Sequence, residues 1–513
     1  MIDLLIAGGT LADGTGAAPR RADVAVTGGR VARIGDLAGC PAARTMDASG
    51  HVVAPGFVDV HTHSDLTLLS APEARSAVRQ GITTVVVGNC GLGVTPAAAT
   101  TGKRCAPPPL PRPGSGRPLG LDRYAWLPGG ARRRAPRRER GRARRAHAAA
   151  RRRRRFRRPP GRRRRARPHA GSARRRARGG RRRRLHGAGL RTGLLRPRGR
   201  TGGARPHGRR ARPLFAWHVR DYADGLLDSV RQALRVAAAT GCRTQISHLV
   251  AVGRRNHGSV ARALELIDAA RAAGLDVGFD IYPYLAGNAP LSQLLPAWAQ
   301  EGGERAMRAR LTDRAVRARV RDGWRDMPNS WDDIVVGGRA VTALAADAGT
   351  DPPDLALDLV AEHGNAVQMV AGGRSERDLA DALAHPAGVI GSDGQALDPA
   401  GPTGRGTPHP APTAASRGCS PSTSGRAARA RRGGPQVHVR AAERAGLAGR
   451  GVLKPGAHAD IVVFDPARIV DRATFAAPQR YPDGIRAVIV GGRAVVEDGA
   501  HGDARPGEIL RVP

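Results

Sequence analysis

Five short apolar stretches of this 513-residue chain, each typical of a β-strand, are followed closely by side chains that bind metals or titrate. The stretches end in His61-Thr62-His63, Asn89-Cys90, Trp217-His218, Ser247-His248 and Ser392-Asp393. In a parallel barrel the carboxyl ends of all strands meet on one face, where such folds build their active sites. The pattern therefore favours a fold in which these five strand ends converge.

The first stretch has the spacing of a metal-binding pair. His61 and His63 are one residue apart at the end of a strand predicted at 57–60, and alternate side chains of a strand project to the same face. Two imidazoles on one face can hold one metal ion. Taken singly, a histidine pair or a free cysteine such as Cys90 is more often ordinary core or surface structure. The recurrence of the pattern on five stretches favours metal chemistry.

Strands and helices alternate through the middle of the chain. Apolar residues recur at helical spacing from 226 to 237, and a strand at 244–249, a helix at 259–273 and a strand at 276–281 follow. Another run, 82–87, is β-branched throughout, which indicates burial on both faces as in parallel sheets. This alternation predicts βαβ units.

Both ends of the chain carry strand pairs of another kind. The pairs are 23–27 with 30–34, across Gly28-Gly29, and 487–490 with 493–496, across Gly491-Gly492. Glycine supplies the positive φ that tight turns require, so each pair predicts a β-hairpin. We expect residues 1–54 and 441–513 to form one small β domain, and residues 55–402 to form the catalytic domain.

Residues 101–213 interrupt this pattern. The segment holds 41 Arg and one Lys against Asp122 and Glu139, and contains no Val, Ile, Met, Asn or Gln. Because it lacks β-branched aliphatic residues and carries dense like charge, it cannot bury enough apolar surface to offset chain entropy. Residues 403–440, with seven Arg and no acid, are similar. The two segments together exceed the chain's net charge of +42, so the remainder is mildly acidic.

Three interpretations of these segments compete. A basic disordered arm would bind nucleic acid nonspecifically through phosphate contacts, and a solvated low-complexity insertion would also fit the composition. We favour GC-rich coding sequence translated in the wrong frame, because such codons yield Arg, Ala, Gly and Pro out of frame. Another frame of the underlying DNA should then encode alternating strands and helices. On this interpretation the barrel is incomplete within 101–213.

The cysteines and the apolar runs bear on the compartment. The five cysteines, which show no paired spacing, are Cys40, Cys90, Cys105, Cys242 and Cys419. We therefore expect no disulfide framework and a reducing compartment. No apolar run approaches the roughly 20 residues of a membrane span, and residues 1–7 lack the flanks of a signal peptide. These features predict a cytoplasmic protein without a membrane partner.

With these motifs in place, the chain resembles the amidohydrolase superfamily and, within it, the N-acyl-D-amino-acid deacylases (D-aminoacylases). The motifs that carry the resemblance are Pro55-Gly56-Phe57-Val58-Asp59-Val60-His61-Thr62-His63-Ser64-Asp65, Gly88-Asn89-Cys90-Gly91, His218-Val219-Arg220-Asp221, Ile246-Ser247-His248, Asp280-Ile281-Tyr282-Pro283-Tyr284, Gly391-Ser392-Asp393-Gly394 and Pro455-Gly456-Ala457-His458-Ala459-Asp460-Ile461-Val462. His-x-His marks the superfamily. Cys90 is the more specific marker, because the deacylases use a cysteine where relatives use a carboxylated lysine or a glutamate. The motifs lie within 1–100, 214–402 and 441–513 and leave out both Arg-rich segments.

The resemblance implies a (β/α)8 TIM-type barrel of the metallo-dependent hydrolase kind, with a small β domain built from both chain ends. It also implies a zinc cofactor. A thiolate ligand binds zinc better than it binds magnesium or calcium. Cys90, His218 and His248 would hold one zinc tightly. A second, weaker position would be formed by His61, His63 and Asp393, with Cys90 shared.

The resemblance further implies hydrolysis of the amide bond of small N-acyl-D-amino acids to a carboxylate and a D-amino acid. Asp393 would take a proton from the attacking water and deliver it to the leaving nitrogen. Tyr282 is a candidate substrate contact. Two alternatives stay open: an amidohydrolase acting on cyclic amides, like a hydantoinase or dihydroorotase, and an inactive frame-disrupted product whose Arg-rich segment binds polyanions. The sequence predicts neither the oligomeric state nor the preferred acyl group.

Overall fold

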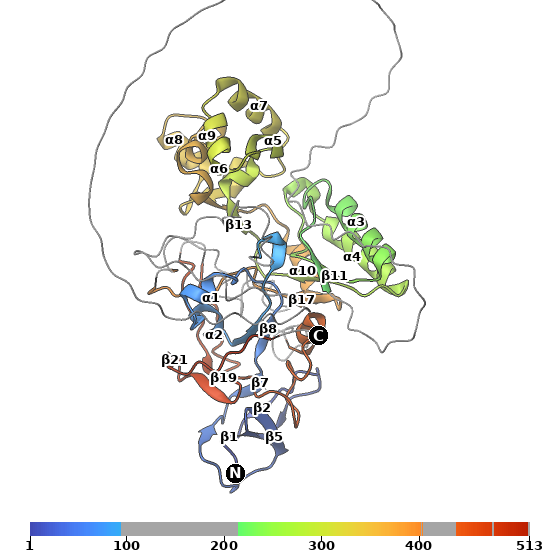
Figure 1. Cartoon of the computed structure of the whole chain (residues 1–513), viewed down its shortest axis with the longest axis vertical. Coiled ribbons are helices and arrows are strands. Elements are labelled where there is room, and N and C mark those ends of the chain that lie inside the picture. Colours follow the sequence, from blue (N-terminus) through green and yellow to red (C-terminus); the bar gives the residue numbers. More distant parts are fainter. Residues whose placement is uncertain (94–213, 402, 404–437, 475–476, 511–513) are drawn as a thin grey trace, which may run out of the picture. The chain divides into compact units, whose positions relative to one another are not determined.

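The structure of the protein is a computed structural model that describes residues 1–93, 214–401, 403, 438–474 and 477–510 (Figure 1). The predictions for 101–213, including the incomplete part of the barrel, lie outside the described residues, as do those for most of 403–440. Among the helices that the structure describes, none combines the length and the apolar character needed to cross a lipid bilayer.

Both predicted glycine hairpins are confirmed. Strand β4 (Asp23–Thr27) pairs antiparallel with β5 (Arg30–Gly35), and β19 (Ile485–Val490) pairs antiparallel with β20 (Arg493–Glu497). The four turn glycines have φ between 53° and 80°, a conformation that other residues adopt only with strain. The two turns also touch, because a Cβ on Gly492 would lie 2.9 Å from the Cα of Gly29.

Strands from the two chain ends share one sheet. Seven strands are hydrogen-bonded in the order β21-β20-β19-β18-β7-β2-β3, and a second sheet has the order β5-β4-β1-β6. The strands not yet introduced are β1 (Leu4–Ala7), β2 (Thr10–Leu11), β3 (Arg20–Arg21), β6 (Thr45–Asp47), β7 (Val52–Pro55), β18 (Ile461–Phe464) and β21 (Ala500–His501). Strands β7 and β18 join the two ends, with Val53 opposite Val463 and both fully buried. The domain boundaries 1–54 and 441–513 stay predictions.

Six parallel strands form the described part of the barrel. They are β8 (Phe57–Asp59), β9 (Ile82–Val85), β10 (Leu214–Trp217), β11 (Arg243–Ile246), β12 (Val277–Ile281) and β17 (Gly388–Ile390). Strands β10, β11, β12 and β17 are neighbours in that order, and β8 pairs with β9. Strands β17 and β8 continue the succession at their carboxyl ends, because the Asp393 amide donates to the His61 carbonyl at 2.9 Å.

Helices follow the barrel strands, as the predicted alternation requires. They are α1 (Thr67–Ser70), α2 (Arg75–Val78), α3 (Leu226–Thr240), α4 (Ser259–Ala272), α10 (Glu376–Ala384) and, after the second undescribed gap, α13 (Val439–Ala445). Gly241, with φ 65°, ends α3. The core between strands and helices includes Ile246, Ile267 and Phe279, all fully buried.

An insert between β12 and β17 was not predicted. Its antiparallel sheet has the order β13-β16-β14-β15, and its helices α5 to α9 form the yellow-green group in Figure 1. The elements are β13 (Gly287–Pro290), α5 (Ala297–Gln300), α6 (Glu304–Arg310), α7 (Arg314–Trp324), β14 (Ile334–Val336), β15 (Arg339–Ala340), α8 (Val341–Asp347), α9 (Pro352–His363) and β16 (Gln368–Ala371). The insert has its own apolar core, with Leu311, Ile334 and Leu357 fully buried.

Candidate metal centre

The predicted metal ligands all follow the carboxyl ends of barrel strands. His61 and His63 follow β8, Cys90 lies in the short 3-10 turn η1 (Asn89–Gly91) after β9, and His218 follows β10. His248 follows β11, and Asp393 follows β17. Parallel strands bring these ends to one face, so side chains more than 300 residues apart in sequence come into contact.

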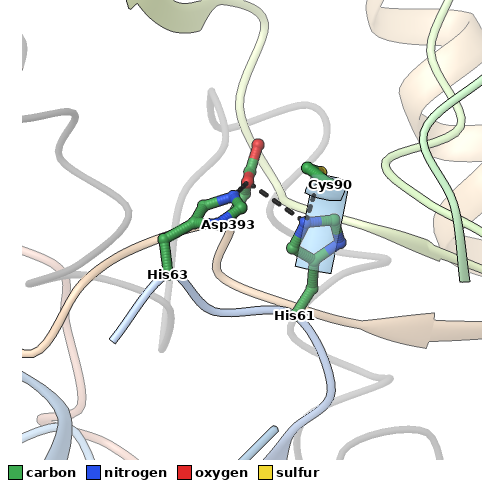
Figure 2. A group of neighbouring side chains, drawn as sticks. All are labelled: His61, His63, Cys90 and Asp393. Carbon is green, nitrogen blue, oxygen red and sulfur yellow. Dashed lines mark hydrogen bonds and ion pairs between the residues drawn. The ribbon is translucent and has the colours of Figure 1, made fainter. Parts of the chain in front are cut away.

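The first group of side chains joins His61, His63, Cys90 and Asp393 (Figure 2). Figure 2 shows both histidines, which come from one segment, directed at Asp393. The Asp393 Oδ1 lies 2.9 Å from His63 Nε2 and 3.3 Å from His61 Nε2. The Cys90 Sγ lies 3.3 Å from the same His61 nitrogen.

The second group joins Cys90 with His218 and His248. The Cys90 Sγ lies 3.2 Å from His218 Nδ1 and 3.5 Å from His248 Nε2. The two imidazole rings meet edge to face, with their centroids 4.7 Å apart. Cys90 therefore belongs to both groups, and its sharing by two metal positions, which the family resemblance implies, stays a prediction.

The backbone is strained at three of these residues. Cys90, His248 and Asp393 have φ of 55°, 35° and 53°, and they are three of only five non-glycine residues with positive φ in the described part of the chain. A non-glycine residue persists in this region only when its surroundings hold it there, and such strain gathers at functional sites. The fold thus stabilises a local conformation that directs these side chains toward one another.

Asp280 in β12 contacts both groups, although the sequence analysis assigned it no role of its own. Its Oδ1 accepts a hydrogen bond from His61 Nδ1 at 2.8 Å and another from the His248 backbone amide at 2.7 Å. Because Nδ1 of His61 donates here, its Nε2 can present a lone pair to a metal ion once that nitrogen has lost its proton. A charged residue inside a fully buried strand was the signal that could have identified Asp280.

Asp59 holds the two strands of the first group together. It is 4% exposed and accepts backbone hydrogen bonds from His61 at 3.1 Å and from Ser392 at 3.0 Å. Burial raises the pKa of Asp59 to about 6, while these hydrogen bonds act to lower it. The contacts fix the register of the two segments that carry His61 and Asp393.

The pKa values of the candidate ligands favour the binding of a metal ion. Burial alone would raise the pKa of the Cys90 thiol, but hydrogen bonds from His218, His248 and His61 lower it to about 2. Burial alone would lower the pKa of His63, but the hydrogen bond to Asp393 raises it to about 9. At neutral pH the group thus contains a thiolate and protonated imidazole, and a cation can replace the protons.

The donor set suits a soft or borderline divalent cation. One thiolate with two or three imidazoles and a carboxylate is typical of zinc sites, whereas magnesium and calcium prefer all-oxygen sites. The residues present therefore fit the metal that the sequence predicts.

Tyr282 directly follows β12 at the same face. It is 5% exposed, and its ring centroid lies 6.5 Å from that of His248. Its hydroxyl accepts a hydrogen bond from Nη1 of Arg374 at 2.8 Å, a residue to which the sequence analysis assigned no role. Tyr282 thus lies beside the candidate metal ligands, and its role as a substrate contact stays a prediction.

A parallel barrel with cysteine, histidine and aspartate side chains gathered at the carboxyl ends of its strands defines a metal-dependent hydrolase. The sequence model of the amidohydrolase family (Amidohydro_3) matches residues 44–196 and 232–496, and the chain belongs to this family. The match extends into the Arg-rich segment, further than the motifs alone predicted.

Relatives match nearly the whole chain. N-acyl-D-aspartate deacylase of Alcaligenes xylosoxydans xylosoxydans is 33% identical over 99% of this chain and 95% of the relative. D-aminoacylase of the same organism is 32% identical over 99% of this chain and 97% of the relative. The crystal structure of N-acyl-D-glutamate deacylase from Bordetella bronchiseptica with zinc and a phosphonate inhibitor has a TM-score of 0.61 at 25% identity and covers 96% of each chain. The predicted fold class and the resemblance to deacylases are confirmed.

Proposed function

We propose that the protein is a zinc-dependent hydrolase that cuts the amide bond of N-acyl-D-amino acids and releases a carboxylate and a D-amino acid. The observation that carries the proposal is the position of Cys90, whose sulfur lies 3.2–3.5 Å from nitrogens of three histidines. The full-length similarity to deacylases of N-acyl-D-amino acids supports the substrate class.

The proposed ligands divide between two positions. Cys90, His218 and His248 would hold one zinc tightly, and His61, His63 and Asp393, sharing Cys90, would hold a second metal more weakly. Zinc bound there would polarise the amide carbonyl and lower the pKa of water to about 7.

Asp393 is the proposed catalytic base and acid. Burial alone would raise the pKa of Asp393, but the electrostatic interaction with His248 and the hydrogen bond from His63 hold it below its usual range, so the group is ionised at neutral pH. Asp393 would then carry a proton from the attacking water to the leaving nitrogen.

The proposed partner is a small-molecule N-acyl amino acid, and the proposed compartment is the cytoplasm. The compartment rests on the unpaired spacing of the cysteines, and the described cysteines Cys40, Cys90 and Cys242 form no disulfide with one another.

A substrate panel tests the proposed function. The zinc-loaded full chain is incubated with the N-acetyl derivatives of D- and L-aspartate, glutamate and leucine, and with a hydantoin as the cyclic amide. We expect release of free D-amino acids and little release of the L-forms. Cleavage of the hydantoin alone would favour the cyclic-amide alternative, and a folded, zinc-loaded chain that cleaves nothing would overturn the proposal.

A further inference from the structure

Arg444 reaches from helix α13 into the barrel. Its side chain is 13% exposed, its Nη1 pairs with Asp276 just before β12, and its Nη2 donates to the Thr244 carbonyl at 2.6 Å. A Cβ at Gly278 in β12 would lie 3.0 Å from Nε and 3.1 Å from Cζ of this arginine. A methyl group there would crowd the guanidinium, so the glycine leaves the arginine room beside the strands.

The remaining contact of Arg444 is with Gln245, in β11. Nε of Arg444 donates to Oε1 of Gln245 at 3.2 Å, and Gln245 is 2% exposed. Because an arginine offers only donors, this contact turns the oxygen of the glutamine amide toward Arg444 and its NH2 group away from it. That group, Nε2, donates to Oδ2 of Asp280 at 3.1 Å. The arginine thus fixes the direction in which the glutamine amide points.

The register of β11 and β12 makes this arrangement possible. Gln245 is the partner of Gly278 in the parallel pair, and Asp280 follows Gly278 by two residues. Alternate residues of a strand project to the same face, so Gly278 and Asp280 belong to one face of β12. Gln245 lies opposite a residue without a side chain and therefore contacts both Arg444 and Asp280.

Asp280 carries the connection on to the candidate metal ligands. Its Oδ1 accepts hydrogen bonds from the His61 ring and the His248 backbone, one residue from each group of ligands. Within the described part of the chain, Gln245 supplies the only hydrogen bond to Oδ2. A buried carboxylate oxygen without a donor is costly, so loss of the Gln245 amide would favour rotation of the carboxylate. Such a rotation would also disturb the two hydrogen bonds of Oδ1.

We infer that Gln245, aligned by Arg444, is a positioning residue that holds Asp280 in the orientation required for metal binding. The inference rests on the proposed function, because the metal centre is taken from there. The competing interpretation is that Gln245 and Arg444 only stabilise the fold, as residues toward the amino-terminal face of such barrels commonly do. The two interpretations differ in whether the affinity for metal depends on Gln245.

The affinity of the metal-free full chain for zinc, measured by competition with a chelator, tests the inference. Gln245→Met keeps the length of the side chain but cannot donate to Asp280. We expect it to weaken zinc binding about tenfold, the lower end of the range for residues that hydrogen-bond directly to a ligand. With cobalt(II) in place of zinc, the absorption spectrum of the bound ion should change as well. Gln300→Met, at a half-buried glutamine whose amide donates to the Leu295 carbonyl, should change neither.

A double-mutant cycle separates positioning from stability. In an Asp280→Ala protein the Gln245 amide has no carboxylate to hold, so the addition of Gln245→Met should change zinc affinity less than twofold. Urea unfolding of each metal-free variant measures stability separately, and Gln245→Asn, one carbon shorter, provides the same comparison if the methionine variant does not fold. An equal loss of affinity in both backgrounds would overturn the inference. Wild-type affinity and an unchanged cobalt spectrum in the folded variant would do so too.

The binding measurement separates this inference from the proposed function. If zinc affinity depends on Gln245 through Asp280 but the zinc-loaded chain cleaves no N-acyl-D-amino acid, the proposed function fails and the positioning role stands. If the chain cleaves these substrates and Gln245→Met retains the zinc affinity of the wild type, the function stands and the inference fails.

Discussion

One carboxylate oxygen of Asp280 accepts hydrogen bonds from the His61 ring at 2.8 Å and from the His248 backbone at 2.7 Å. His61 belongs to the group around Asp393, and His248 belongs to the group around His218. Asp280 therefore orients one histidine of each proposed metal position. It does so from a strand buried at every residue, where the fold leaves it little freedom to move.

Substitution of Asp280 should weaken metal binding without removing a ligand. Asp280→Asn keeps the size of the side chain but removes the charge that favours Nδ1 protonation on His61. We expect zinc affinity to fall about 10- to 100-fold, as measured by competition with a chelator. Asp268→Asn removes an exposed carboxylate that contacts His385, and it should leave the affinity unchanged. Equal effects of the two variants would contradict the role of Asp280.

Substitution of Cys90 should affect both metal positions at once, because both groups contain its sulfur. Cys90→Ser replaces a thiolate with a hydroxyl that stays protonated at neutral pH. We expect bound zinc, measured by elemental analysis after desalting, to fall well below one ion per chain. Activity should fall more than about 100-fold, which is more than substitution of a residue that only hydrogen-bonds to a ligand would cost. Cys242→Ser, at a half-buried cysteine away from the site, is the matched control. A Cys90→Ser protein that retains its zinc would contradict the shared ligand.

Substitution of Asp393 should separate catalysis from tight metal binding. Asp393→Asn removes the proposed proton carrier, while the group of Cys90, His218 and His248 stays complete. We expect kcat to fall about 100- to 10,000-fold with at least one zinc per chain retained. Asp381→Asn, on the exposed side of α10, should keep full activity. Wild-type kcat in the Asp393→Asn protein would exclude this residue as base.

The stability of the protein should depend on pH through His438. This residue is fully buried against Phe57, and burial lowers its pKa from 6.5 to about 4. Between these values the unfolded chain binds a proton that the folded chain does not, so the free energy of unfolding falls as the pH drops below about 6.5. Above that pH the residue has no such effect.

Urea unfolding at pH 7 and pH 5 measures the contribution of His438. His438→Leu should reduce the loss of stability between the two pH values by about 2 kcal/mol. His363→Leu, at an exposed histidine, should lose as much stability between pH 7 and pH 5 as the wild type does. An unchanged loss in the His438→Leu protein would show that this histidine is not neutral in the folded state.

The convergence of the candidate metal ligands was predictable because its signal is local. His61, Cys90 and His248 each follow an apolar stretch, and parallel strands bring such ends together whatever lies between them. The hairpins across Gly28 and Gly491 were predictable for the same reason, since the turn residues lie between the strands that they join.

The insert and the residues that support the ligands depend on distant contacts. Strand β13 pairs with β16, roughly 80 residues later, and no local pattern specifies that partner. Arg374 is one arginine after two glycines, and its contact with Tyr282, 92 residues away in sequence, became apparent only in the structure. Asp280 was visible as a charge in an apolar strand, but its partners His61 and His248 became apparent only in the structure.

The most direct test of the proposed function is a zinc titration of the metal-free full chain with N-acetyl-D-aspartate as substrate and release of free D-aspartate as the readout. We predict no release without metal, release that rises with the first equivalent of zinc, and loss of release on addition of a chelator. A chain that binds zinc, stays folded and releases no D-aspartate or other D-amino acid from its N-acetyl derivative would contradict the account.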